Sequence, residues 1–293
     1  MLLALLTIVW GINWPVMKLG VTGFAPLSFR ALSLWIGLPV LWAVLRAMRV
    51  PFAIDRCDWP RLAALTFTNM LVWHVLAILA IQALSSGRAA ILGYTMPIFS
   101  ALWGVAMFGE RLRARHIAGI AAAAVGVSLL LWHELDSLAG QPLAAFAMLV
   151  AAAVWALGTQ QMRRTTIAAP TLAIVFWMTL ATALTMTTLA WLFERDRWTA
   201  PSAPTWAAVV YNAVLIFGFA QPIWLVMARN LPPIASSMSV MMIPVLGTLT
   251  GAWWLGERLH WQDGAAIVLV LVAIASVMWP TRREALSSTT LSS

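Results

Sequence analysis

The stretch FGERL at residues 108–112 lies between two apolar runs, and LGERL at residues 255–259 lies between two others. When residues 96–132 are laid over residues 243–279 without gaps, the Gly-Glu-Arg-Leu of the two turns coincides. The same register aligns further pairs on both sides of the turns: Pro97 with Pro244, Gly104 with Gly251 and Trp132 with Trp279. A turn repeated with matching surroundings indicates an internal duplication.

Composition places the whole chain in a membrane. Of its 293 residues, 62% are hydrophobic and only 10% are charged, whereas soluble domains carry about 25% charged residues. Lipid cannot satisfy exposed backbone groups, so apolar runs that cross a ~30 Å hydrocarbon layer must be helices. The expected spans are 2–20, 26–45, 61–83, 88–108, 115–132, 142–161, 170–193, 205–228, 234–255 and 263–280. The sequence therefore predicts an all-α polytopic membrane protein with ten transmembrane helices.

The duplication divides these spans into two units of five helices. The expected domains are residues 1–135 and 142–281, followed by a disordered tail at 282–293. Because five is odd, the second unit enters the membrane from the opposite side, and the two units form an inverted repeat. Many transporters follow this plan, with a substrate site near the midplane between the halves and alternating access by rocking.

The positions of the basic residues predict the orientation. If the N-terminus is cytoplasmic, the inner segments hold Arg46, Arg49, Arg56, Arg61, Arg111, Arg113, Arg115, Arg163, Arg164, Arg229, Arg282 and Arg283. The outer segments then hold only Lys18, Arg88, Arg195, Arg197 and Arg258. This asymmetry predicts that both termini lie in the cytoplasm. The expected location is a bacterial inner membrane.

Other classes of function find no support in the sequence. The net charge of +8 is spread over short turns rather than one face, which argues against a nucleic-acid partner. The single cysteine, Cys57, excludes an intramolecular disulfide. Because P-loops, dinucleotide fingerprints, metal-ligand clusters and nucleophile elbows are absent, we expect no enzyme activity, no cofactor and no metal site. The expected partners are a small-molecule substrate and lipid, and the chain is a monomer or a homodimer.

At this point the chain resembles a family. Two five-helix units, a Trp-Gly pair followed by a lysine near the start (Trp10, Gly11, Lys18) and a GERL turn closing the fourth span of each unit are similar to EamA-type members of the drug/metabolite transporter superfamily. The resemblance implies a ten-helix exporter whose central cavity is lined by spans 1–4 and 6–9, and it extends to the YddG-like branch of aromatic amino-acid exporters. The second unit departs from the pattern, since Trp155 is followed by Ala156.

All ten Asp and Glu residues fall in loops or at span ends. Proton-coupled pumps usually place a carboxylate within the membrane, and a permanently cationic substrate would also require a buried anion. The pattern therefore favours facilitated diffusion over carboxylate-based proton antiport.

Polar and aromatic side chains within the spans are the candidate substrate-binding residues. His74 is the one mid-span group that titrates near neutral pH, and it aligns with Gln221 in the repeat. It contacts substrate or gates the path, or it is a neutral histidine bonded to a neighbouring helix. Because Trp73 precedes it and lies about 100° away around the helix, the two are not expected to face the cavity squarely together. The full candidate set is Trp10, Asn13, Trp73, His74, Tyr94, Trp155, Trp177, Tyr211, Asn212 and Gln221.

Four prolines interrupt the apolar spans, where proline removes a helix hydrogen bond and bends the helix. Pro15, Pro97, Pro222 and Pro244 are the candidate hinges, with static packing bends as the alternative. Arg30 and Lys18, both near the outer face, either snorkel to the headgroups or form a vestibule that attracts a carboxylate.

The repeated turn has a local explanation. Gly109 and Gly256 can adopt the left-handed conformation that ends a helix. The glutamates that follow, Glu110 and Glu257, would then sit near the start of the next helix, where the helix dipole favours a carboxylate.

The predicted function is export of small metabolites, best suited to aromatic or large neutral amino acids, by alternating access. The main alternative is a proton-coupled exporter of hydrophobic or cationic drugs. A sugar-phosphate exchanger would need several basic residues at the midplane, and a lipid-modifying enzyme would need a catalytic cluster.

Overall fold

We describe the protein from a computed structural model that covers residues 2–109, 114–136, 141–230 and 242–278. Every regular element in these ranges is helical. The α-helices are α1 Leu2–Val21, α2 Pro26–Ala47, α3 Trp59–Thr66, α4 Val72–Ala83, α5 Ser86–Gly93, α6 Met96–Phe108, α7 Ala114–Asp136, α8 Pro142–Arg163, α9 Thr171–Glu194, α10 Ala203–Tyr211, α11 Gln221–Asn230, α13 Met242–Leu255 and α14 Trp261–Met278. Short 3₁₀ turns precede α3 at Arg56–Asp58 and follow α9 at Arg195–Arg197.

These helices confirm the all-α polytopic membrane fold. Seven segments in the described part of the chain are long and apolar enough to cross a bilayer, and three shorter apolar helices lie at Ile117–Leu130, Met242–Leu255 and Trp261–Ser276. The predicted span 234–255 corresponds to α13, and its first residues lie outside the described ranges. The tail at 282–293 and the turn residues from Glu110 to Leu112 lie outside them as well.

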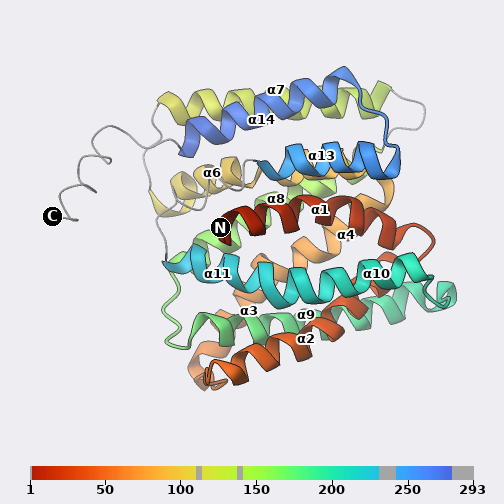
Figure 1. Cartoon of the computed structure of the whole chain (residues 1–293). Coiled ribbons are helices and arrows are strands. Elements are labelled where there is room, and N and C mark those ends of the chain that lie inside the picture. Colours follow the sequence, from red (N-terminus) through yellow and green to blue (C-terminus); the bar gives the residue numbers. More distant parts are fainter. Residues whose placement is uncertain (1, 110–113, 137–140, 231–241, 279–293) are drawn as a thin grey trace.

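Helices from corresponding places in the two parts of the chain pack against each other. In Figure 1, α7 and α14 lie side by side along one edge, and α2 and α9 lie along the opposite edge. Each of these pairs joins spans that are equivalent in the two halves. Between them, α1 packs on α13 and α6 packs on α8, and these two pairs are also related by the repeat. The cavity described below lies among the inner helices.

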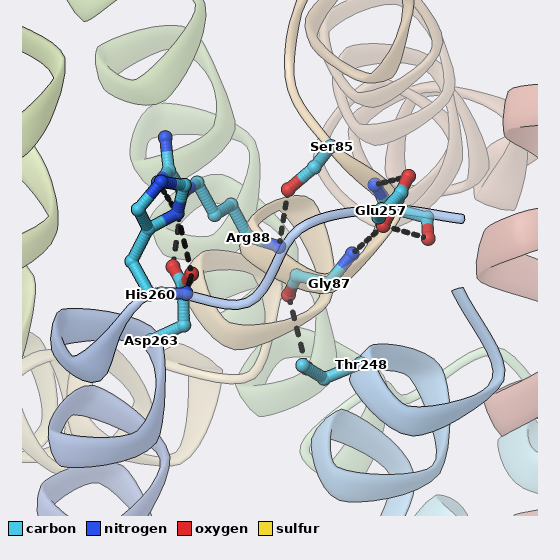
Figure 2. A network of polar contacts seen from close by, with 8 residues as sticks. Ser85, Gly87, Arg88, Thr248, Glu257, His260 and Asp263 are labelled. Atoms are coloured by element: carbon cyan, nitrogen blue, oxygen red, sulfur yellow. Dashed lines mark hydrogen bonds and ion pairs between the residues drawn. The ribbon is translucent and has the colours of Figure 1, made fainter. Parts of the chain in front are cut away.

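The two turn glycines have the predicted conformation, but Glu257 caps a different helix from the one expected. Gly109 (φ 65°) ends α6, and Gly256 (φ 66°) follows α13. The carboxylate of Glu257 accepts hydrogen bonds from the backbone N–H groups of Ser86 (2.7 Å) and Gly87 (3.3 Å) and from the Ser86 hydroxyl (2.8 Å). It therefore satisfies the first turn of α5, in the other half of the molecule, rather than the start of α14 (Figure 2). Turn chemistry alone could not show this, because the capped helix comes from the opposite repeat.

A second carboxylate makes the same kind of contact between the halves. Glu194, at the end of α9, accepts from the backbone N–H groups of Leu27 (2.9 Å) and Ser28 (2.8 Å) at the start of α2. The chain starts α2 and α5 after an odd number of crossings, so both caps lie at the same membrane face. Lys18 caps the end of a further helix. Its ammonium donates to three carbonyls at the end of α4, those of residues 81, 82 and 84. The lysine is thus a helix cap rather than a snorkelling side chain.

Two π-helical stretches occur at equivalent places in the two halves. They cover Phe67–Leu71, between α3 and α4, and Asn212–Ala220, between α10 and α11. Such bulges are rare and are frequent at functional sites. Here they immediately precede the helices that carry His74 and Gln221, so local unwinding sets the rotation of both polar side chains.

Candidate functional site

A cavity lies between the two halves of the molecule. It comprises about 440 Å³ of space free of protein atoms, including the part open to solvent. Its lining comes from both repeats: Trp10, Asn13, Trp14, Met17, Arg30, Trp73, His74, Tyr94, Met96, Trp155, Ile216 and Gln221. Such a position between repeats is where transporters of this plan bind substrate.

Aromatic rings form one wall of this cavity as a continuous cluster. Consecutive ring centroids lie 6.3 Å (Tyr94–Trp14), 6.4 Å (Trp14–Trp73), 4.9 Å (Trp73–Trp155) and 6.4 Å (Trp155–Trp10) apart. Trp224 does not line the cavity but packs on Trp10, with ring centroids 5.4 Å apart. Most of these pairs meet edge to face, the arrangement that ring quadrupoles favour. Trp155 sits at the junction, since it contacts Trp10, Trp73 and Trp224. The wall offers large apolar faces to a ligand.

Trp73 and His74 both belong to the cavity lining, although the two were not expected to face it squarely together. His74 is buried and packs edge to face on Phe217, with centroids 5.2 Å apart. Trp73 is only partly buried. Its indole is large enough to reach the edge of the cavity from the neighbouring helix position.

Several polar atoms around the cavity are buried and have no hydrogen-bond partner in the protein. These atoms are the Asn13 side-chain oxygen, Arg30 Nε, both His74 ring nitrogens and Trp155 Nε1. Buried polar groups in folded proteins are almost always paired. Five such atoms on one cavity therefore point to a polar guest, either water or a ligand. They include donors on Arg30 and Trp155 and an acceptor on Asn13.

Arg30 does not snorkel. Its side chain is only 2% exposed and faces the cavity, where Nη1 donates to Asn212 Oδ1 at 3.1 Å and Nη2 contacts the Met17 sulfur at 2.8 Å. The guanidinium also lies 5.9 Å and 5.6 Å from the ring centroids of Phe29 and Phe217. The position of Arg30 near the start of α2 suggested that its side chain extends to the lipid headgroups. Instead, the side chain points toward the second half of the molecule, where it contacts Asn212 and Phe217.

Three of the predicted residues do not line the cavity. Trp177 packs on Trp59 (5.3 Å between centroids) and donates to the Phe52 carbonyl, in a separate cluster with the α2–α3 connection. The Tyr211 hydroxyl donates to the Val9 carbonyl at 2.7 Å and ties α10 to α1. Asn212 lies behind Arg30 and holds it. The remaining predicted residues, Trp10, Asn13, Trp73, His74, Tyr94, Trp155 and Gln221, are brought together at the cavity.

Five lining residues were not among the predicted substrate-binding residues: Trp14, Met17, Arg30, Met96 and Ile216. A signal for two of these was present. Trp10, Asn13, Trp14 and Met17 follow the i, i+3, i+4, i+7 spacing that places residues on one face of a helix. That spacing could have assigned the whole inner face of α1 to the cavity.

The candidate hinge prolines lie in different local settings. Pro97 is in the first turn of α6, just after the break at Tyr94–Thr95 that divides this span into two helices. Pro222 follows the π-helical stretch at the start of α11, Pro15 lies inside a continuous α1, and Pro244 is buried near the start of α13. Their role as hinges remains a prediction.

Within the part of the chain that the structure describes, no group of three His, Cys, Asp or Glu side chains could hold a metal ion. The cavity is thus equipped for binding through aromatic faces, an amide, an imidazole, an indole N–H and a guanidinium.

Comparison with known proteins places this geometry in context. The EamA-like transporter family matches residues 1–132 and again residues 142–279. The chain is 25% identical over 268 residues to the uncharacterized transporter YoaV of Bacillus subtilis (strain 168), covering 90% of this chain and 89% of that protein. It is 26% identical over 283 residues to a probable amino-acid metabolite efflux pump of Salmonella typhimurium, covering 92% and 91%.

An Escherichia coli K12 protein, also a probable amino-acid metabolite efflux pump, is 24% identical, with coverage of 92% of this chain and 91% of that protein. A solved crystal structure superposes with a TM-score of 0.71 at 23% identity, covering 94% of this chain and 96% of that chain, which shows that the fold is shared. The family match extends over both halves of the chain and agrees with the helical membrane fold and the central cavity. The chain is therefore a multi-pass membrane protein that belongs to the EamA-like transporter family.

Proposed function

We propose that this protein exports aromatic or large neutral amino acids across the bacterial inner membrane by alternating access. The exporter runs by facilitated diffusion, with both termini in the cytoplasm. The observation that carries the proposal is the central cavity, which is lined by indole and phenol rings and by residues whose buried polar atoms lack protein partners.

The lining matches the chemistry of such substrates. An apolar or aromatic side chain gains contact with the rings, while the charged backbone groups of an amino acid can bind the unpartnered donors and acceptors. The two efflux pumps among the relatives, described as acting on amino-acid metabolites, support the same class of substrate.

The drug-exporter alternative fits the cavity less well. A cationic drug would enter beside the buried guanidinium of Arg30, and like charges repel strongly where water is excluded. Among the described residues that line the cavity, none carries a carboxylate that could offset this repulsion.

Flux into proteoliposomes tests the proposal. The full chain is reconstituted, and uptake of radiolabelled phenylalanine, tryptophan, alanine, lysine and a cationic dye is measured with and without a pH gradient. We expect saturable flux of phenylalanine and tryptophan that does not depend on the gradient, and little flux of lysine or dye. Dye flux that requires the gradient would overturn the proposal in favour of proton-coupled drug export.

A further inference from the structure

Arg30 is a buried cation without a buried counter-ion. Among the residues that the structure describes, none of the ion pairs involves it. An uncompensated charge removed from water costs several kcal/mol, so such groups are normally paired. The unpaired charge of Arg30 therefore suggests a ligand anion that pairs with the guanidinium while it is bound and then leaves.

The neighbours of Arg30 hold its guanidinium in place without neutralising it. Asn212 donates from Nδ2 to the Ala208 carbonyl at 3.1 Å, which turns its Oδ1 toward Arg30. The second contact, the Met17 sulfur, is a weak acceptor. Phe29 and Phe217 flank the group, and Nε is left without a partner. The guanidinium of this cavity-lining residue is therefore held in place and keeps an unpartnered donor.

Other charged groups in this part of the molecule are already engaged. Glu194 accepts from the backbone at Leu27 and Ser28 and from the Ser28 hydroxyl (2.8 Å). Lys18 donates to three carbonyls at the end of α4. Neither Glu194 nor Lys18 contacts the Arg30 guanidinium in any ion pair or hydrogen bond given above. The guanidinium is therefore the charged group that the cavity lining offers to a ligand.

The remaining unpartnered atoms indicate which anion fits. Trp155 Nε1 is a second donor, His74 supplies a donor and an acceptor when neutral, and the Asn13 oxygen is an acceptor. A carboxylate accepts two or more such bonds and pairs bidentately with arginine, and the Asn13 oxygen can accept from an ammonium. We infer that Arg30 is the carboxylate-binding subsite of the cavity. The carrier therefore recognises small monocarboxylates bearing an apolar or aromatic group, amino acids among them.

This inference rests on the proposed function for its biological setting, but binding can test it separately. The purified full chain in detergent is heated with phenylalanine, with 3-phenylpropanoate, which lacks the amine, or with phenethylamine, which lacks the carboxylate. The variants are Arg30→Gln, Arg30→Lys, which keeps the charge but loses the planar fork, and the control Arg46→Gln. Arg46 lies on the same helix and stacks on Trp42, outside the cavity lining.

We expect phenylalanine and 3-phenylpropanoate to raise the unfolding temperature of the wild type, and phenethylamine to leave it unchanged. Half-saturating concentrations should rise about tenfold or more in Arg30→Gln, since bonds to charged groups are the strong ones. Arg30→Lys should be intermediate, and Arg46→Gln should match the wild type. Equal stabilisation by phenethylamine, or unchanged binding in a folded Arg30→Gln variant, would overturn the inference.

The two proposals fail in different ways. Stabilisation by carboxylates without amino-acid flux in liposomes would refute the proposed function and leave the subsite standing. Amino-acid flux that Arg30→Gln and Arg30→Lys do not alter would refute the subsite and leave the function standing. If Arg30→Gln does not fold, Arg30→Lys and the ligand comparison on the wild type decide the question.

Discussion

Arg30 shows what sequence can and cannot reveal about a single residue. The sequence was sufficient to predict that no carboxylate lies in the middle of the membrane, because all ten Asp and Glu residues fall in loops or at span ends. Charged groups in the middle of a membrane are costly and therefore rare. The orientation of Arg30 could not be predicted, because a side chain one turn into a helix reaches either headgroups or a cavity, depending on rotation about the axis. Contacts with Asn212 and Phe217, far away in the sequence, fix that rotation.

The indole N–H of Trp155 provides a residue-scale prediction. Trp155→Phe keeps an aromatic ring in the cavity lining but removes a buried, unpartnered donor. Losing one hydrogen bond of about 1 kcal/mol should weaken phenylalanine binding roughly threefold to tenfold, measured by ligand-dependent thermal unfolding. Trp224→Phe is the matched control, because its indole N–H is also buried and unpartnered but Trp224 does not line the cavity. Equal loss of affinity in both variants would contradict a direct contact with Trp155.

At the scale of elements, hydropathy was sufficient to locate the spans, because bilayer thickness and backbone satisfaction leave little choice. The irregularities within spans were not predictable in the same way. The π-helical stretches and the break at Tyr94–Thr95 depend on neighbouring helices. One such contact is the approach of α8 to the π-helical stretch before α4, where a Cβ added at Gly158 would lie 2.7 Å from the backbone of Asn69.

Gly158→Ala should therefore push α8 away from this stretch. Overpacking against backbone atoms typically costs about 1–3 kcal/mol, so we expect the unfolding temperature to fall by several degrees and substrate flux to decrease. Gly264→Ala in α14 is the control, because nothing lies within 4 Å of its added Cβ. Alanine favours a helix over glycine there, so that variant should be as stable as the wild type or slightly more so. An unchanged unfolding temperature in Gly158→Ala would contradict this expectation, because it would show that the two helical segments can separate at little cost in free energy.

At the scale of the whole molecule, the repeat was visible in the sequence, but the pairing of helices from the two halves was not. The way the halves hold each other was not visible, because Glu257 and Glu194 cap helices of the opposite half. These caps join the two halves at one membrane face. We expect at least one of them to separate when the cavity opens to that face.

Glu257→Gln should therefore make the cavity easier to reach from that face. In a Cys57→Ser background, Ile216→Cys places a reporter thiol in the cavity lining. A membrane-impermeant thiol reagent added from the face that carries Glu257 should label it several-fold faster when Glu257 is replaced. Arg258→Gln, a change to an exposed side chain of the same turn, should leave the rate unchanged. Labelling that is insensitive to Glu257→Gln would show that the cap does not hold this face closed.

The orientation of the whole molecule can be tested with its single cysteine. Cys57 is exposed in the connection between α2 and α3, which the distribution of basic residues predicts to lie in the cytoplasm. A membrane-impermeant maleimide should leave Cys57 unlabelled in intact spheroplasts and label it after permeabilisation. A Cys57→Ser, Ala200→Cys protein has its thiol in the exposed connection before α10. This thiol should be labelled already in intact spheroplasts. The reverse result would invert the assigned topology.

The buried guanidinium of Arg30 also bears on how the membrane stays sealed while the carrier works. A path that opens alternately to water on each side risks conducting hydronium and sodium, which would dissipate the proton-motive force. A fixed positive charge in the lining of such a path raises an electrostatic barrier against small cations, as arginine does in water-conducting pores. The residue that we propose for binding carboxylates is thus also expected to keep the membrane electrically insulated throughout the transport cycle.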